Sequence, residues 1–131
     1  MVDCMIIGDS IAVGTSLYRK DCITYAQSGI NTHNWLKKYS DRQLFARTVV
    51  ISLGSNDLDN IRHEREDLEY LRNSIVGDRV LWILPSIKPR VQEIIWSIAE
   101  AFGDDVIEVH GVSSDGVHPT TGAYKSIAKS F

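Results

Sequence analysis

Short runs of apolar residues recur along the chain and alternate with segments of helical periodicity. Most of the runs are continuous and rich in Val and Ile, which is typical of parallel strands covered on both faces. The pattern therefore predicts five short strands, each followed by a helical segment. The predicted strands are Cys4–Ile7, Cys22–Ala26, Thr48–Leu53, Arg79–Leu84 and Val106–Val109.

Three of the predicted helices carry an apolar stripe at intervals of three and four residues, which indicates one buried face. We expect Asp59 or Asn60 to cap the first of these three helices. We also expect Trp35, after the second strand, to face the core, and His33 and His63 to be exposed to solvent. The stripes consist of Ile61, Leu68, Leu71 and Ile75; of Val91, Ile94, Ile95, Ile98 and Phe102; and of Tyr124, Ile127, Ala128 and Phe131.

Alternation of strands and helices in 131 residues predicts a single domain, residues 1–131, of the doubly wound α/β sandwich class. Right-handed crossovers then place the loops that follow the strands along one edge of the sheet. Ligands bind at this edge in sheets of this kind. The sequence shows no internal repeat, low-complexity tract or linker.

Composition narrows the range of partners and compartments. The net charge is −3, and no block of Lys or Arg indicates a nucleic-acid partner. The apolar runs are too short to span a membrane, and residues 1–4 do not begin a signal peptide, so we expect a soluble protein, cytoplasmic or of unknown compartment. Cys4 and Cys22 lie inside apolar runs, which favours two buried free thiols over a disulfide. Nothing in the sequence indicates the oligomeric state.

Two motifs supply the parts of a nucleophile and its base. Gly8-Asp9-Ser10 closes the first strand and puts Ser10 at a helix N-terminus, where backbone N–H groups and the helix dipole favour negative charge. In Asp115-Gly116-Val117-His118-Pro119, the carboxylate can orient the imidazole, which can then take a proton from a serine. The alternatives are an ordinary N-cap serine and a turn with an incidental histidine.

Two further motifs supply hydrogen-bond donors for an oxyanion. Asn56, in Gly54-Ser55-Asn56-Asp57, offers a side-chain N–H, and Gly29, in Ser28-Gly29, offers a backbone N–H. The alternatives are an Asn/Asp-rich turn that caps its own helix and an ordinary turn glycine. We expect Asp57 to brace its loop rather than to react.

All four motifs follow a predicted strand, so we expect them at one edge of the sheet. The sequence has no phosphate-binding loop, no dinucleotide-binding glycine motif and no Cys/His metal spacing. The combination predicts a serine esterase that uses neither a cofactor nor a metal.

From Gly8 to Pro119 the chain resembles the SGNH hydrolases, a branch of the GDSL-type lipases and esterases, although Ile11 replaces the leucine of the GDSL motif. The resemblance implies a three-layer α/β/α, flavodoxin-like fold with a five-stranded parallel sheet in the order 2-1-3-4-5. It also implies that Ser10 is the nucleophile, Asp115 the acid and His118 the base. Gly29 and Asn56 match the oxyanion glycine and asparagine, and the Ser10 N–H is a further oxyanion donor.

The expected reaction is hydrolysis of a carboxylic ester through an acyl-enzyme, on a small molecule or a carbohydrate. Only Leu58–Asp78 joins the third motif to the fourth strand, which leaves little chain for a lid. We therefore expect short acyl groups such as acetyl. The alternative is a non-catalytic module that binds a glycan or an acyl ligand on the same fold.

Overall fold

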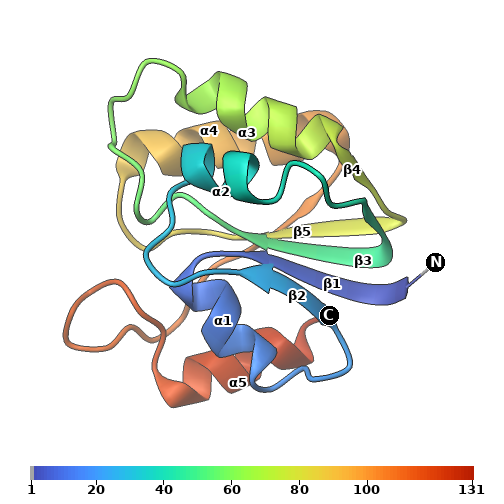
Figure 1. The fold of residues 1–131 in the computed structure, drawn as a ribbon. Coiled ribbons are helices and arrows are strands. Elements are labelled where there is room, and N and C mark those ends of the chain that lie inside the picture. Colours follow the sequence, from blue (N-terminus) through green and yellow to red (C-terminus); the bar gives the residue numbers. More distant parts are fainter. Residues whose placement is uncertain (1) are drawn as a thin grey trace.

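A parallel β-sheet runs through the centre of the molecule, and helices cover both of its faces (Figure 1). This computed structural model describes residues 2–131. The strands are β1 (Val2–Gly8), β2 (Ile23–Ala26), β3 (Leu44–Ser52), β4 (Ile75–Val76), β5 (Arg79–Ile83) and β6 (Asp105–Ile107). The helices are α1 (Ser10–Ser16), α2 (Thr32–Lys38), α3 (Glu64–Asn73), α4 (Pro89–Phe102) and α5 (Thr121–Lys129).

The strands follow the order β2-β1-β3-β5-β6, and each neighbouring pair is parallel. Numbered among the five strands that the sequence predicts, this order is 2-1-3-4-5, so the predicted fold class is confirmed. The two-residue β4 is additional and pairs with the start of β3, with Leu44 opposite Ile75. The last strand, β6, begins one residue earlier than predicted and ends at Ile107 rather than Val109.

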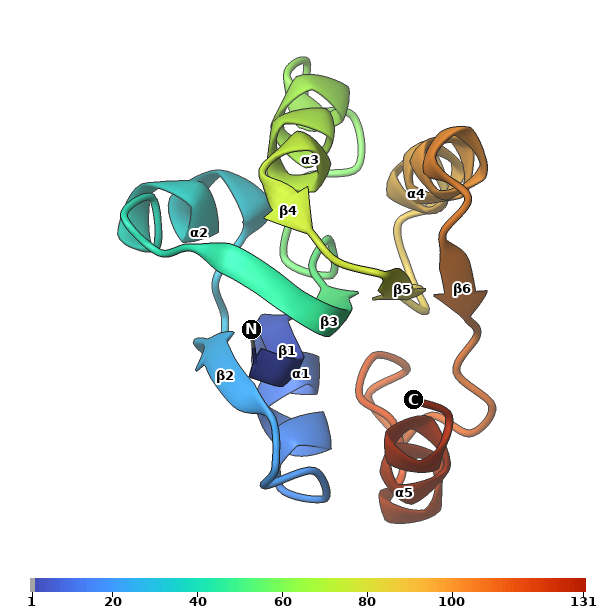
Figure 2. The ribbon, with the colours of Figure 1, turned by 90° about the vertical axis from the view of Figure 1, so that its right-hand side faces the viewer.

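Three layers result, because α2, α3 and α4 cover one face of the sheet while α1 and α5 cover the other (Figure 2). Successive side chains of a strand point to opposite faces. Along β1, Met5 and Ile7 accordingly join the core under α2, α3 and α4, while Cys4 and Ile6 join the core under α1 and α5. None of the helices in the described residues has the length and hydropathy needed to cross a lipid bilayer.

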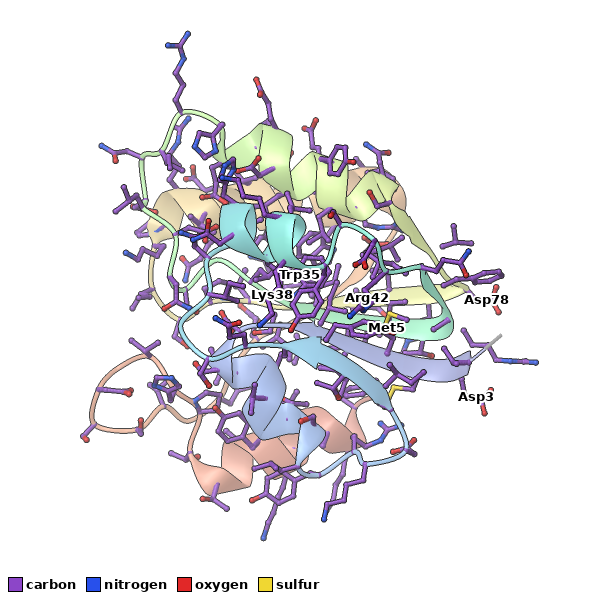
Figure 3. The ribbon with its side chains drawn as sticks, viewed as in Figure 1. Asp3, Met5, Trp35, Lys38, Arg42 and Asp78 are labelled. Carbon is purple, nitrogen blue, oxygen red and sulfur yellow. A yellow bond between two sulfur atoms is a disulfide. The ribbon has the colours of Figure 1, made fainter. Side chains whose placement is uncertain are left out.

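Trp35 anchors α2 to the sheet, as expected from its aromatic character. Its side chain points from α2 towards the strands (Figure 3) and is 1% exposed. The indole N–H donates to the carbonyl of Tyr25 in β2 at 3.0 Å, which satisfies its one polar group. The position of α2 is therefore fixed by both burial and a hydrogen bond.

The prediction that Asp59 or Asn60 caps the helix that contains Leu68 and Leu71, which is α3, is wrong. The helix α3 begins at Glu64, after a turn that ends at His63, and no side chain caps it. Asp59 instead accepts hydrogen bonds from the backbone N–H groups of Arg90 at 3.0 Å and Val91 at 3.3 Å. The aspartate thus caps α4, which begins about thirty positions further along the chain.

All three predicted apolar stripes extend beyond the buried faces of their helices, since Ile61 precedes α3 and Phe131 follows α5. Ile75 is buried, but it lies in β4 rather than in α3, which ends at Asn73. Phe102 ends α4 with 42% of its surface exposed, and the guanidinium of Arg72 lies 4.3 Å from its ring centre. Helical spacing alone cannot distinguish these positions from core positions, since the spacing does not show where a helix ends.

The prediction of two free thiols is also wrong, because Cys4 and Cys22 form a disulfide. Strands β1 and β2 pair with Met5 opposite Ile23, so Cys4 lies beside Cys22 on the same face of the sheet, with Cα atoms 4.6 Å apart. This separation lies within the range that a disulfide spans. The apolar runs around the cysteines favoured buried free thiols. The pairing of β1 with β2, which the sequence does not show directly, instead places the two thiols close enough to form a disulfide.

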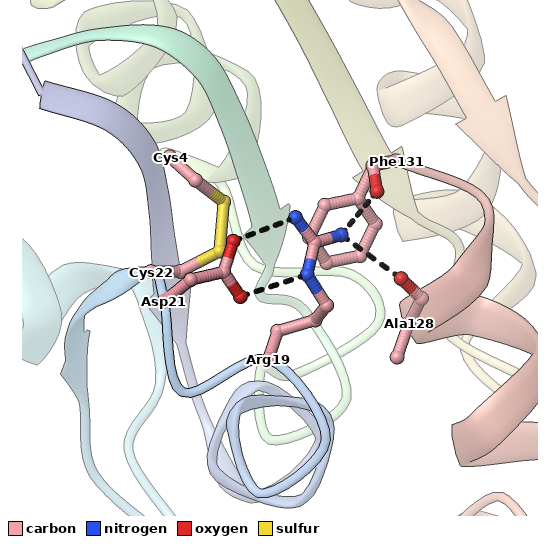
Figure 4. Close-up of a disulfide and its surroundings, with 6 residues drawn as sticks. All are labelled: Cys4, Arg19, Asp21, Cys22, Ala128 and Phe131. Carbon is pink, nitrogen blue, oxygen red and sulfur yellow. Dashed lines mark hydrogen bonds and ion pairs between the residues drawn. A yellow bond between two sulfur atoms is a disulfide. The ribbon is translucent and has the colours of Figure 1, made fainter.

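A second set of contacts surrounds this disulfide (Figure 4). Arg19, in the turn between α1 and β2, forms a two-pronged ion pair with Asp21 at 3.0 and 3.1 Å. The same guanidinium donates to the carbonyls of Ala128, at 2.9 Å, and Phe131. The turn that leads into β2 is therefore held both to β1 and to the end of α5.

Reduction of the disulfide should lower the stability of the protein. A cross-link between residues 18 apart in sequence removes conformational entropy from the unfolded chain and stabilises the fold by about 3 kcal/mol. For a domain of this size, we expect the melting temperature to fall by roughly 10 °C in dithiothreitol. Calorimetric scans with and without the reductant measure the change.

A Cys4→Ala/Cys22→Ala double variant is the control, because its melting temperature should not respond to dithiothreitol. Titration of thiols in the unfolded, unreduced wild type should detect none. Two reactive thiols per chain, together with a melting temperature indifferent to the reductant, would contradict the assignment of the disulfide.

Candidate active site

The order of the strands brings three of the four motifs together. Strand β1 lies between β2 and β3, so the loop that follows β1 is flanked by the loops that carry Gly29 and Asn56. Gly8 at the end of β1 has φ +144°, and a Cβ there would lie 1.8 Å from the carbonyl oxygen of Ser52. Only glycine permits this approach, which turns the chain directly into α1 at Ser10.

Asp9 fixes the start of α1 beneath the Ser10 position. Its side chain is fully buried and accepts hydrogen bonds from the N–H of Ile11 at 3.0 Å and the hydroxyl of Ser52 at 3.2 Å. Burial raises the pKa of Asp9 to about 6, although these two hydrogen bonds act in the opposite direction. Asp9 therefore serves as a buried N-cap that joins α1 to β3.

The structure places Ser10, His118 and Asp115 in one hydrogen-bonded chain. The Ser10 Oγ lies 2.8 Å from His118 Nε2, and His118 Nδ1 lies 2.6 Å from Asp115 Oδ2. A carboxylate beside Nδ1 favours the tautomer with the proton on that nitrogen. Nε2 is then free to accept the proton of the serine hydroxyl.

The loop after β6 holds this arrangement by its own hydrogen bonds. Asp115 Oδ1 accepts from the N–H groups of Val117 and His118, each at 2.9 Å, and from the hydroxyl of Ser113 at 2.9 Å. The hydrogen bond from His118 and these further donors hold the pKa of Asp115 well below the usual range of a carboxyl. Asp115 therefore stays ionised, and it shapes the loop as well as orienting the ring.

The side chains of His118 and Asp115 are accessible to solvent. The His118 side chain is 43% exposed and the Asp115 side chain is 49% exposed. Solvent molecules can therefore reach His118 without a prior movement of the chain.

Gly29 and Asn56 lie on the two loops that flank Ser10. Gly29 has φ +79°, a conformation that favours glycine, and no atom lies within 4 Å of the position that a Cβ would occupy. The side chain of Asn56 donates through Nδ2 to the carbonyl of Ile30 at 3.1 Å, which ties the two loops together. That bond uses one of the two N–H groups of the amide, so the second N–H is available to a ligand.

Asp57 braces the same pair of loops, as expected. Its carboxylate accepts from the backbone N–H of Thr32 at 2.8 Å and from the Thr32 hydroxyl at 2.7 Å. The buried Glu64 lies beside it. Burial, and then the neighbouring Asp57, raises the pKa of Glu64 well above its ordinary value, so the protonated Glu64 can donate to Asp57.

The sequence does not indicate this contact between Glu64 and Asp57. An acidic residue in the first turn of a helix indicates only a favourable interaction with the helix dipole. The burial of Glu64 against Asp57 arises from the packing of α3 on the loop after β3, and no local pattern signals it.

Comparison of the sequence with protein-family models and with curated proteins gives no match. Solved structures with a similar fold are found at low sequence identity. A GDSL-like lipase from Bacteroides thetaiotaomicron is 19% identical, with a TM-score of 0.68 over 98% of this chain and 84% of that chain.

Two further solved structures are similar. The C-terminal catalytic domain of peptidoglycan O-acetyltransferase A from Streptococcus pneumoniae is 17% identical, with a TM-score of 0.61 over 97% of this chain and 88% of that chain. An acetyl xylan esterase from Butyrivibrio proteoclasticus is 12% identical, with a TM-score of 0.56 over 97% of this chain and 61% of that chain. These likenesses and the order of the strands show that the chain has the SGNH hydrolase fold.

Proposed function

We propose that the protein is a serine esterase that hydrolyses carboxylic esters through an acyl-enzyme. The observation that carries this proposal is the hydrogen-bonded chain from Ser10 through His118 to Asp115 at the carboxyl ends of the strands. The same fold occurs in a GDSL-like lipase and in an acetyl xylan esterase, which supports the proposal. A module that only binds a ligand would need no serine held against the unprotonated nitrogen of a carboxylate-oriented histidine.

In the proposed mechanism, Ser10 Oγ attacks the carbonyl carbon of the ester while His118 Nε2 takes its proton. The tetrahedral intermediate collapses when His118 returns that proton to the oxygen of the leaving alcohol. Water then attacks the acyl-enzyme, with His118 again acting as the base, and releases the acid. Asp115 orients the ring and stabilises the imidazolium in both steps.

The oxyanion of each tetrahedral intermediate requires donors that are fixed before the reaction. We assign this role to the backbone N–H groups of Ser10 and Gly29 and to the side chain of Asn56. The hydrogen bond from Asn56 to Ile30 orients the amide, and the Asp57–Thr32 contacts keep the two loops together. The donors therefore need little reorganisation when negative charge develops.

We infer that the substrate carries a short acyl group, such as acetyl, on a small molecule or a carbohydrate. The connections at residues 27–31 and 84–88 are short, so they provide little chain to enclose a long acyl group. Half-exposed His118 and Asp115 fit an ester presented on a larger molecule.

Replacement of the nucleophile should abolish ester turnover. Ser10→Ala should lower kcat by a factor on the order of 10⁶ and leave the melting temperature nearly unchanged, because the N-cap Asp9 remains. Release of p-nitrophenol from its acetyl ester measures the rate. Ser126→Ala, at an exposed serine on α5, is the matched control and should retain full activity. Equal turnover by Ser10→Ala and wild type would refute the assignment of Ser10, and an inactive wild type would favour a binding module.

The length of the acyl group should determine the rate. We expect kcat/KM for p-nitrophenyl esters to be highest for acetyl and butyryl groups and to fall for octanoyl and palmitoyl groups. Each ester is assayed below the concentration at which it forms micelles, so that aggregation does not alter the ranking. A steady rise in kcat/KM towards palmitoyl would show that the protein holds long chains.

Asn56→Ala separates a catalytic from a structural role of the amide. A donor to charge that develops in the transition state contributes a factor of about 10²–10³ to kcat, with little effect on KM. Asn56→Asp should lower kcat further, because it places a negative charge beside the oxyanion. Asn60→Ala, at an exposed asparagine in the same connection, is the control.

If Asn56 serves only to tie its loop to Ile30, its loss should instead lower stability by about 1 kcal/mol and leave kcat nearly normal. Both kcat and the melting temperature are therefore measured on the same preparation. A reduced melting temperature with near-normal kcat would exclude Asn56 from the oxyanion hole.

A further inference from the structure

A second group of chemically reactive side chains lies where α2 meets α3. His33 comes from the first turn of α2, His63 precedes the first residue of α3, and Asp67 lies on α3 itself. Asp67 Oδ2 lies 3.1 Å from His33 Nδ1 and 2.7 Å from His63 Nδ1. One ligand atom from each of the three residues lies within 4.8 Å of the other two.

The backbone sets this convergence. His63 and Asp67 are four residues apart and so lie on the same side of α3. His33 is held against them because Asn31 caps α2, accepting from the N–H of Asn34 at 2.8 Å, and because Trp35 fixes α2 to the sheet. The three side chains therefore come from two packed elements rather than from one flexible loop.

The set of atoms suits a transition-metal ion. Two imidazole nitrogens and one carboxylate oxygen are a common ligand set for Zn²⁺, with a fourth position left for water or another ligand. Bonds of about 2.0–2.2 Å around a tetrahedral ion place ligand atoms about 3.4 Å apart. The His33–Asp67 distance of 3.1 Å is already close to this value, and the His63–Asp67 distance of 2.7 Å needs to open by about 0.7 Å.

Access and charge also favour a cation. The side chains of His33 and His63 are 47% and 41% exposed, so an ion can enter from solvent, while that of Asp67 is 17% exposed. The three residues line the pocket of about 90 Å³ that Asn56 and Asp57 also line. The Asp57 and Asp67 carboxylates make this pocket attractive to a positive ion.

We propose that His33, His63 and Asp67 form a binding site for a divalent transition-metal ion, with Zn²⁺ as the best match. The ion would join α2 to α3 and form part of the wall of the pocket beside Asn56. This site is separate from the Ser10–His118–Asp115 chain, and its existence does not depend on the esterase proposal.

Calorimetric titration with zinc chloride tests the site, with purified protein that carries no polyhistidine tag. We expect one Zn²⁺ per chain, and a rise in melting temperature with zinc, since a ligand that binds the folded state stabilises it. His33→Ala, His63→Ala and Asp67→Asn should each weaken binding by at least about tenfold. His33→Ala removes an exposed side chain, so this variant keeps the test valid if Asp67→Asn proves unstable.

Two matched variants exclude other histidines. His118→Ala removes the other histidine–carboxylate pair that could bind zinc, and His110→Ala removes an exposed histidine outside the cluster. Both should bind Zn²⁺ as tightly as the wild type. The proposal is overturned if the wild type binds no zinc, if His33→Ala and His63→Ala bind as the wild type does, or if His118→Ala abolishes the binding.

Discussion

The close contact between the ends of β1 and β3 determines the geometry of the sheet edge at which Ser10 lies. The Gly8 backbone approaches the Ser52 carbonyl so closely that no side chain fits between them, and the N–H of Asp9 donates to that same carbonyl at 2.9 Å. The chain has to leave the sheet at this point, and it enters α1 within two residues. Ser10 is therefore presented by a rigid junction of two strands rather than by a mobile loop.

The two flanking loops and the loop after β6 are each fixed by a carboxylate. Asp57 spans the loops after β2 and β3 by binding Thr32, and Asp115 organises the loop that carries His118. Asp9 holds the start of α1 in the same way. Three carboxylates thus position four segments by accepting hydrogen bonds from backbone N–H groups, which fixes irregular chain around Ser10 and His118.

Much of the fold was predictable because it depends on local patterns. Continuous Val- and Ile-rich runs gave the strands, and the motifs after those strands gave Ser10, Asp115 and His118, which the structure brings together. Features that depend on strand register or on packing between distant segments were not predictable in this way. Asp59 caps α4, and Cys4 pairs with Cys22, only because the folded chain places them opposite partners.

The cluster of His33, His63 and Asp67 belongs to the same class of features. A search for metal-binding spacing within a short segment cannot find it, since His33 and His63 are thirty positions apart in the printed sequence and meet only through the packing of α2 against α3. Likewise, the burial of Glu64 depends on how α3 lies over the loop after β3.

The disulfide has a consequence for how the molecule behaves among its own copies. Strand β2 stands at one edge of the sheet, so the backbone groups on its outer side have no neighbouring strand within the described chain. Such edges can pair with another chain and start aggregation. The cross-link to β1 keeps this short strand in its native register. While Cys4 and Cys22 stay oxidised, β2 therefore cannot separate from β1 and uncover the edge of β1 as well.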